Sequence, residues 1–311
     1  MKNILIILFF ITVFIFAGEP IKPIALHLKY NYQKAKLGYM LFMDPNLSSS
    51  GKVSCATCHD LNHGGADPRK TAVSVGVNGQ KGSSNAPTVF NSYFGFRQFW
   101  NGRAKNLDTQ AGGPLYNPVE MGMDNQKIQK YLRNNKFYVK EFKAIYHEKP
   151  TAKDVANAIA EFEKALFTPN CKFDKYLRGE IKLSKEEKKG YELFKTLGCI
   201  TCHNGVDIGD NSYQKMGVIH PYKWGKNTPD RYAITHKKSD KNVFKVPTLR
   251  NILLTAPYFH DGSAKDIKEA LNSMAYHNLG LKLTHSEIKA LIAFFKTLTG
   301  QKPAILKRLS R

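Results

Sequence analysis

SCATCHD at residues 54–60 and GCITCHN at residues 198–204 carry the same five-residue motif, Cys-x-x-Cys-His. This motif is the attachment sequence for c-type haem: both thiols add to the vinyl groups of the porphyrin, and the adjacent histidine ligates the iron. A thioredoxin-like dithiol or a zinc site also uses Cys-x-x-Cys, but neither requires the adjacent histidine. Two copies therefore predict two covalently bound haem c groups.

The motif assigns a tether and a proximal ligand to each haem. The first haem takes Cys55, Cys58 and His59, and the second takes Cys199, Cys202 and His203. Four of the five cysteines are used in this way, so the pattern is not that of a disulfide framework. Cys171 remains without a role, and a buried thiol is favoured over an intermolecular bridge.

A second pattern also occurs twice, in the same order. The first copy reads PTVFN (87–91), eight residues and WNG (100–102), and the other reads PTLRN (247–251), eight residues and HDG (260–262). Two motifs repeated in the same order indicate a duplicated unit. Trp100 of the first copy corresponds to His260 of the second.

Helical patterns flank both haem motifs. Ser184 and Glu187 form a capping-box signature that predicts a helix through Leu197, directly before the second motif. Thr284 and Glu287 predict another helix, with apolar residues at a period near 3.6. Thr151 opens an equivalent helix in the first half, whose apolar face holds Val155, Ile159, Phe162 and Leu166.

Long loops are predicted between these helices, because glycine and proline are frequent at 60–95, 111–125 and 204–230. Alternating strand patterns are scarce. The sequence thus predicts a mostly α protein with two cytochrome c-like helical domains, each with one covalently bound haem c. The predicted N-terminal domain spans residues 19–170, and the C-terminal domain spans residues 171–311.

The first 18 residues are typical of a secretory signal peptide. Lys2 precedes an apolar run from Ile4 to Ala17, and small residues follow. The run is shorter than the roughly 20 apolar residues of a membrane span, although an uncleaved anchor is the alternative. We therefore expect export to the periplasm, removal of the signal and no stable membrane insertion.

The chain is strongly basic, with 47 Lys and Arg residues against 25 Asp and Glu and a net charge of +22. Such an excess of positive charge favours binding to nucleic acid, to an acidic partner or to an anionic surface. Export argues against nucleic acid, and no basic run with interleaved aromatic residues resembles a nucleic-acid reader. The lysines are spread along the chain, so most are interpreted as solvated surface residues. The more specific hypothesis is that some of them form a docking surface for an acidic redox partner.

The sixth iron ligand decides what each haem does, because a haem with two protein ligands moves electrons and one with an open face activates a small molecule. Candidates for the second haem are Met216, His220, His236, His260, Met274 and His277. Periodicity alone places Met274 on an apolar helix face and favours a packing role. Candidates for the first haem are His63, Met121 and Met123, and nothing local selects among them.

Longer stretches resemble the bacterial dihaem cytochrome c peroxidases and the related MauG-type dihaem enzymes. The likeness extends from Leu37 to Gly300 and is most specific in CATCHD, GQKGSSNAPTVFN, QFWNGRA, QAGGP, NPVEMG, VPTLRN and TAPYFHDG. It implies that the first haem reduces hydrogen peroxide to water, while a high-potential second haem relays electrons. It also implies a small soluble cytochrome c or similar donor, and a homodimer.

The resemblance implies a role for several single residues. Met274 is the sixth ligand of the second haem, where MauG-type enzymes have tyrosine, and a thioether ligand raises the reduction potential. Trp100 is a relay between the haems, although an aromatic-rich segment by itself favours core packing.

Two further sites are implied by the same resemblance. Glu120 is the acid–base group over the open face of the first haem, with Gln110 beside it in the pocket; an isolated glutamate by itself is usually a solvated loop charge. Asn85 and the backbone carbonyls of Thr255 and Pro257 form a calcium site, since oxygen ligands suit that cation.

One position departs from the family pattern. Many members have a histidine ligand of the first haem where this chain has Val77, and valine cannot bind iron. We expect the first haem to be open in the oxidised enzyme, rather than ligated by a substitute such as His63. A MauG-like oxidase that modifies a protein is the alternative that Val77 favours and Met274 opposes. A non-enzymatic electron carrier would need Met121 or Met123 on the first haem.

Overall fold

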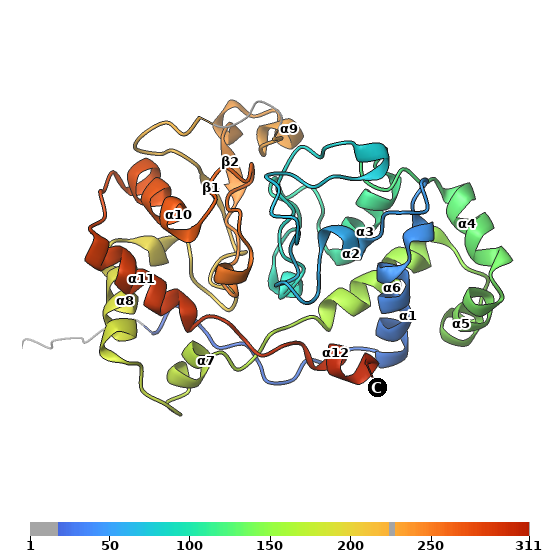
Figure 1. Ribbon diagram of the computed structural model, residues 1–311, viewed down its shortest axis with the longest axis horizontal. Coiled ribbons are helices and arrows are strands. Elements are labelled where there is room, and N and C mark those ends of the chain that lie inside the picture. The colour runs from blue at the N-terminus through green and yellow to red at the C-terminus, as the bar shows by residue number, and fades with distance from the viewer. Residues whose placement is uncertain (1–17, 224–227, 311) are drawn as a thin grey trace, which may run out of the picture.

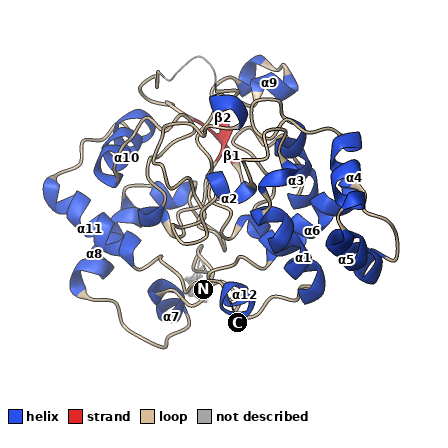
Figure 2. Cartoon of the chain, turned by 45° about the vertical axis from the view of Figure 1, so that its right-hand side comes forward, coloured by secondary structure: helices blue, strands red, loops and turns tan. Residues whose placement is uncertain are grey.

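The structure is a computed structural model that describes residues 18–223 and 228–310, so the predicted signal peptide lies outside it except for Gly18. Two groups of helices lie side by side, as Figure 1 shows. Loops fill the space between them, and most of the helices lie toward the outside (Figure 2). The prediction of a mostly α protein with long loops is confirmed.

The first lobe contains α1 (Tyr32–Met43), α2 (Cys55–Cys58), α3 (Leu107–Tyr116), α4 (Asn125–Asn134), α5 (Lys136–Tyr146) and α6 (Ala152–Lys164). The second lobe contains α7 (Lys172–Leu177), α8 (Lys185–Thr196), α9 (Tyr232–Thr235), α10 (Ile267–Met274) and α11 (His285–Lys296), and α12 (Ala304–Leu309) follows it. In the described ranges the only sheet pairs two antiparallel strands, β1 (Tyr213–Lys215) and β2 (Val243–Lys245).

Short turns complete the secondary structure. The 3-10 turns are η1 (Pro45–Leu47), η2 (Val77–Gly79), η3 (Ser92–Phe94), η4 (Cys199–Thr201), η5 (Lys238–Asp240) and η6 (Ile252–Leu254). A π-helical turn, η7 (Ala275–Leu279), directly continues α10.

Both lobes contain the same close helix crossing. In the first lobe Gly38 of α1 packs on the backbone of Ala158 in α6, and in the second Gly190 of α8 packs on the backbone of Ala290 in α11. A Cβ atom at either glycine would collide with the facing carbonyl group, so the approach requires glycine. The shared crossing supports the duplication inferred from the repeated motifs.

The predicted helix starts are confirmed. Ser184 accepts a hydrogen bond from the N–H of Glu187 and the Glu187 side chain accepts one from Ser184, which completes the capping box. Thr284 and Glu287 form the same arrangement at the start of α11. Thr151 caps α6, which ends at Lys164, so Leu166 is buried just beyond the helix.

The predicted loop at 111–125 is partly wrong, because α3 includes residues 111–116. The Asn106 side chain caps this helix, and Leu107, Ala111 and Leu115 place a buried apolar face along it. Tertiary burial of that face outweighs the low helix propensity of the glycines and the proline in this segment.

Each lobe has its own hydrophobic core, but the two ends of the chain cross to the opposite lobe. Ile21 packs in the second core and pairs with Gly205 in an isolated parallel bridge. Ile305 of α12 packs in the first core. The boundary at 170/171 stays a prediction, and each core includes a residue from the far end of the chain.

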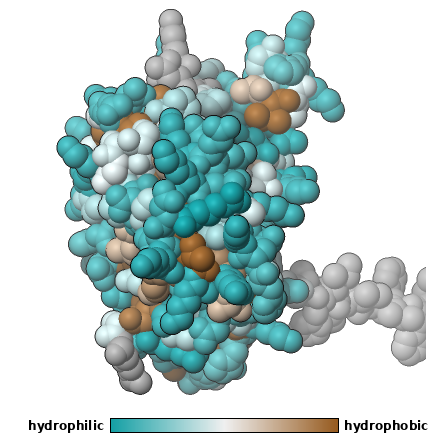
Figure 3. Space-filling model, turned by 90° about the vertical axis from the view of Figure 1, so that its right-hand side faces the viewer, coloured by the Kyte–Doolittle hydropathy of each residue, from teal (hydrophilic) through white to brown (hydrophobic). Residues whose placement is uncertain are grey.

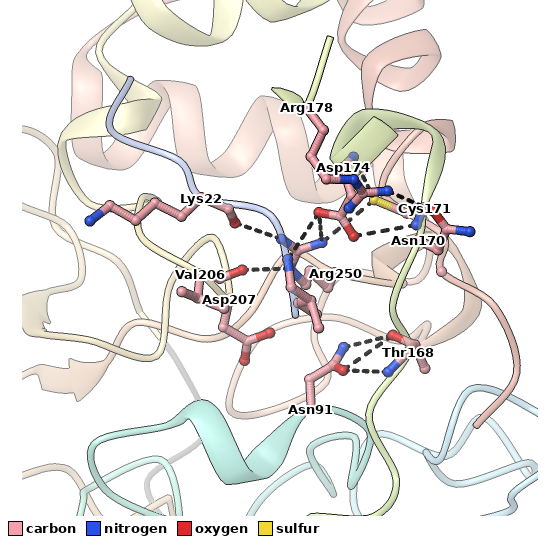
Figure 4. A network of polar contacts seen from close by, with 12 residues as sticks. Lys22, Asn91, Thr168, Asn170, Cys171, Asp174, Arg178, Val206, Asp207 and Arg250 are labelled. Carbon is pink, nitrogen blue, oxygen red and sulfur yellow. Dashed lines mark hydrogen bonds and ion pairs between the residues drawn. The ribbon is translucent and has the colours of Figure 1, made fainter. Parts of the chain in front are cut away.

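A buried cation holds the N-terminal segment against the second lobe (Figure 4). Arg250 pairs with Asp174 at 2.9 Å and donates to the carbonyl oxygens of Lys22 at 3.0 Å and Val206 at 2.6 Å. Its Nη1 lies 3.5 Å from the Sγ of Cys171. Cys171 is buried, as predicted.

The two lobes are also joined by a symmetric pair of asparagines. Asn91 accepts a hydrogen bond from the backbone N–H of Thr168 at 2.8 Å, and Asn251 donates to its hydroxyl at 2.9 Å. These asparagines end the two PT-x-x-N motifs, so the repeated sequence also builds the junction between the copies.

The surface agrees with the high charge of the chain. The face that carries α4 and α5 is largely hydrophilic, with small and separate hydrophobic patches (Figure 3). Across residues 18–223 and 228–310, none of the helices combines the length and the apolar character that a membrane crossing needs.

Candidate functional site

The first Cys-x-x-Cys-His motif lines a cavity of about 680 Å³. Cys55, Cys58 and His59 contribute to its wall, and Glu120 and Gln110 line the same cavity. The structure therefore brings together five residues that the sequence assigned to one site. A covalently attached haem fits this donor set, because two thiols and one imidazole face a common space.

The orientation of His59 suits an iron ligand. Its Nδ1 lies 3.3 Å from the carbonyl oxygen of Gly65. When Nδ1 donates its proton there, Nε2 is left for a metal, which is the usual arrangement of a ligating histidine. Burial lowers the pKa of His59, so the neutral imidazole is favoured.

Glu120 stands on the loop after α3 and is held by Asn117. The Asn117 side chain donates to Glu120 Oε1 at 2.7 Å, and the Glu120 N–H donates to the Asn117 carbonyl at 3.0 Å. Burial raises the pKa of Glu120, while the Asn117 bond and the charge of Arg103 oppose that rise. A carboxyl group with a raised pKa can take a proton and return it.

Glu163 is a further carboxyl group in this cavity that the sequence reading missed. It lies on α6 and is fully buried, and its Oε2 makes no hydrogen bond to any described residue. Burial raises its pKa to about 8, which keeps it protonated at neutral pH. The signal was present in the sequence, since Glu163 follows Ile159 by four residues and therefore shares its apolar face.

The candidates for the sixth iron ligand of the first haem differ in whether they line its cavity. Met121 lines the first cavity, whereas His63 and Met123 are not among the described residues of its wall. The side chain of His63 is 68% exposed and binds Asp60 at 2.5 Å. Val77 is buried, and its N–H donates to the Glu120 carbonyl at 2.9 Å. His63 is thus poorly placed to substitute for the missing histidine.

The second motif lines a smaller cavity of about 110 Å³. Cys199, Cys202 and His203 form part of its wall. His203 repeats the geometry of His59, with Nδ1 3.3 Å from the Ile208 carbonyl and a pKa that burial lowers to about 4. The donor set again fits a covalent haem, and the stacked rings of Phe244 and His260, 3.9 Å apart, narrow the space.

Three of the six candidates for the sixth iron ligand of the second haem line this cavity. They are Met216, His260 and Met274, whereas His220, His236 and His277 lie outside its described wall. Met274 is the last residue of α10 and is half-buried, so the helix that was expected to use it for packing also presents it to the cavity.

Trp100 lies between the two cavities. It lines the second, while its neighbours Phe99 and Asn101 line the first. Its ring packs edge-on against His260 with the ring centres 6.2 Å apart, and its Nε1 donates to the Asn85 carbonyl at 2.8 Å. This position suits the relay that the family resemblance implies.

Asn85 joins the lobes. Its N–H donates to the His260 carbonyl at 2.9 Å, and its side-chain nitrogen donates to the Ala72 carbonyl at 3.1 Å. In the part of the chain that the structure describes, no three His, Cys, Asp or Glu side chains cluster so as to hold a metal ion.

The second lobe covers part of the first cavity, which the sequence did not predict. Pro229, together with Ala233 and Ile234 of α9, lines that cavity. Thr228 donates to the Ser83 carbonyl at 2.8 Å and fixes this contact. The first cavity is therefore built by both lobes.

Known proteins resemble this chain over most of its length. A family model described as di-haem cytochrome c peroxidase matches residues 32–182, and one described as cytochrome c matches residues 187–299. The cytochrome c551 peroxidase of Nitrosomonas europaea is 46% identical over 289 residues, which cover 92% of this chain and 86% of that protein.

Proteins connected with MauG are more distant. The methylamine utilization protein MauG of Methylorubrum extorquens is 31% identical over 287 residues, covering 88% of this chain and 80% of that protein. The crystal structure of a MauG-like protein associated with microbial copper homeostasis superposes with a TM-score of 0.79 at 28% identity, covering 90% of this chain and 93% of that one.

Proposed function

The chain belongs to the di-haem cytochrome c peroxidase family, and from this premise we propose that it reduces hydrogen peroxide to two waters with two electrons and two protons. The presence of His59 and Glu120 in the wall of one cavity carries the proposal. Haem, when bound there, would supply an iron that can bind peroxide and exchange electrons. The protein supplies the proximal ligand and the proton transfer.

Glu120 moves the proton. It accepts the proton of the inner peroxide oxygen and returns it to the outer oxygen, which then leaves as water. Asn117 holds the carboxyl group in place at 2.7 Å, and Gln110 lines the same space. The cavity keeps the carboxyl group partly out of water, which supports its use as both base and acid.

The second site stores and relays the electrons. His203 and Met274 are proposed as its two iron ligands, with Cys199 and Cys202 as tethers, because all four line one cavity. Trp100 is proposed as the relay between the sites. A small soluble cytochrome c or similar protein is the proposed donor, and the net charge of +22 favours an acidic one.

A MauG-like oxidase is less well supported, because the MauG relative is 31% identical and the peroxidase relative 46%. A pure electron carrier is favoured by one observation, that Met121 lines the first cavity. Peroxide turnover by the isolated protein would exclude a pure electron carrier. A rate of peroxide consumption that does not change when a candidate protein substrate is added would argue against the oxidase.

The valine at position 77 leads to a spectroscopic prediction. We expect the fully oxidised protein to show a high-spin, five-coordinate haem signal and to react with peroxide without prior reduction, because no histidine reaches the first cavity from this segment. Electron paramagnetic resonance and stopped-flow mixing of the as-isolated and half-reduced forms check it. Two low-spin signals with no high-spin species would contradict it.

A calcium ion between the lobes is also proposed, on the side-chain oxygen of Asn85 and the carbonyls of Thr255 and Pro257. Asn85 supports it because it is buried at the contact with His260. We expect the holoprotein treated with a chelator to bind one calcium per chain in calorimetry, and Asn85→Ala to bind it more weakly. Equal heats for both proteins would remove this site.

Export and assembly remain proposals. Periplasmic location with a cleaved signal rests on the first 18 residues, and N-terminal sequencing of the exported protein tests it. The homodimer rests on the family resemblance, and light scattering tests it.

A further inference from the structure

Aromatic rings form an unbroken series from Trp100 to the surface of the second lobe. Trp100 contacts His260 at 6.2 Å between ring centres, and His260 contacts Tyr222 at 6.1 Å. Tyr222 contacts His277 at 5.0 Å, and His277 contacts Tyr276 at 5.0 Å. The series thus starts between the two cavities and ends outside both.

The outer end of this series is fixed by the π-helical turn η7, which follows Met274. Such turns are rare and are frequent at functional sites. Tyr276 is 42% exposed there, and the ring of His220 stacks on it at 4.2 Å. The Nδ1 of His277 lies 2.9 Å from the His220 carbonyl, so the two histidines whose rings contact Tyr276 are linked to each other.

Only three members of the series lose an electron readily. Indole and phenol rings are oxidised in one-electron steps far more easily than imidazole, so Trp100, Tyr222 and Tyr276 are the stations. His260 and His277 separate them, and each step crosses a single imidazole ring.

The protons that accompany these steps have acceptors. The hydroxyl of Tyr222 contacts Ser263 Oγ and lies 3.5 Å from both carboxylate oxygens of Asp261. The exposed ring of Tyr276 can release its proton to water.

We propose, on the basis of the proposed function, that this series is an exit for oxidising equivalents that runs along the wall of the second cavity and ends at Tyr276. It operates when peroxide has oxidised the first site and no electron donor is available. Electrons then move inward from Tyr276 through Tyr222 and Trp100, and the oxidised tyrosine stands on the surface, where it reacts with another phenol.

The chemistry balances with the phenol of a second copy of this chain. Two Tyr276 side chains each lose one electron and one proton, and a carbon–carbon bond forms between the two rings. The electrons and protons convert one hydrogen peroxide into two waters. The net reaction is therefore one peroxide and two tyrosines to one dityrosine and two waters.

The test mixes the holoprotein with peroxide without a donor, and locates dityrosine by peptide mass spectrometry and tyrosyl radicals by freeze-quench electron paramagnetic resonance. We expect the wild type to cross-link through Tyr276, and Tyr276→Phe to lose that product. Tyr222→Phe should also lose it, although Tyr276 is still present. Tyr93→Phe is the matched control, because Tyr93 is 44% exposed and contacts Phe94 rather than the series.

Two results would overturn the exit path. One is an undiminished Tyr276 product in Tyr222→Phe, and the other is a wild-type product that forms equally at Tyr93. Donor-dependent peroxide turnover is measured on the same samples. A wild type that turns over peroxide but gives no Tyr276 product removes the exit path alone, whereas one that consumes no peroxide removes the proposed function and the exit path with it.

Discussion

Glu120→Gln is expected to lower peroxide turnover by about 10²–10⁴-fold, the usual contribution of a positioned general acid–base group. The amide keeps the size of the side chain and an oxygen that Asn117 can reach, but it cannot take a proton from peroxide and return it. Steady-state turnover with a reduced small cytochrome c measures the loss.

The pH profile provides a second readout of the same variant. Glu120 must be ionised to act as a base, so activity falls as the pH drops through its pKa. Because burial raises that pKa, the acidic limb lies at higher pH than for an exposed carboxyl group, and it disappears in the variant.

The control for this variant is Glu148→Gln, which removes an exposed carboxyl group and should leave turnover unchanged. The haem spectra and reduction potentials of Glu120→Gln should match those of the wild type. Turnover by Glu120→Gln close to the wild-type rate would contradict the assigned role of this carboxyl group.

Arg250→Met is expected to lower the free energy of unfolding by about 3–5 kcal/mol, because it leaves the Asp174 carboxylate buried without its partner. Both side chains are almost fully buried. The carbonyl groups of Lys22 and Val206 also lose their donor. Chemical denaturation of the holoprotein measures the change.

Lys127→Met is the matched control, since Lys127 and Asp124 form an exposed ion pair 3.3 Å apart. We expect a change of about 0–1 kcal/mol there. The double variant Arg250→Met with Asp174→Leu should regain part of the lost stability, because no buried charge remains. An effect of Arg250→Met no larger than that of the control would show that the pair is not needed.

Arg250 shows that equivalent positions in the two copies can carry side chains with different roles. It takes the place that Phe90 takes in the first PT-x-x-N motif, and Phe90 packs in the first core. In the second lobe the same position carries a buried cation that binds Asp174 and the N-terminal segment. A shared backbone geometry therefore supports an apolar contact in one copy and a polar network in the other.

Local signals in the sequence predicted local structure well. The capping boxes at Ser184 and Thr284 lie where expected, and the repeated motifs mark equivalent points of the two lobes. These features depend on residues within a few positions of one another, so spacing alone reveals them.

The parts that sequence reasoning missed depend on contacts between distant segments. Arg103 lies on the loop before α3, yet its charge acts on Glu120, which lies on the loop after that helix. The cover that α9 provides over the first cavity requires the second lobe to lie against the first. Residues 111–116 are helical because the apolar face of α3 is buried. The low helix propensity of the glycines and the proline in this segment hid that helix from the sequence prediction.

The crossing of the chain ends makes the order of synthesis matter. The first lobe is made early, yet the residue that completes its core, Ile305, is among the last to be added. The second lobe is made late, yet it needs Ile21 from the beginning of the chain. A chain that ended just before α12 would therefore lose apolar contacts in the first lobe, which is farther from the break in the sequence. Each of the repeated halves, although built alike, takes part of its core from the opposite end of the chain.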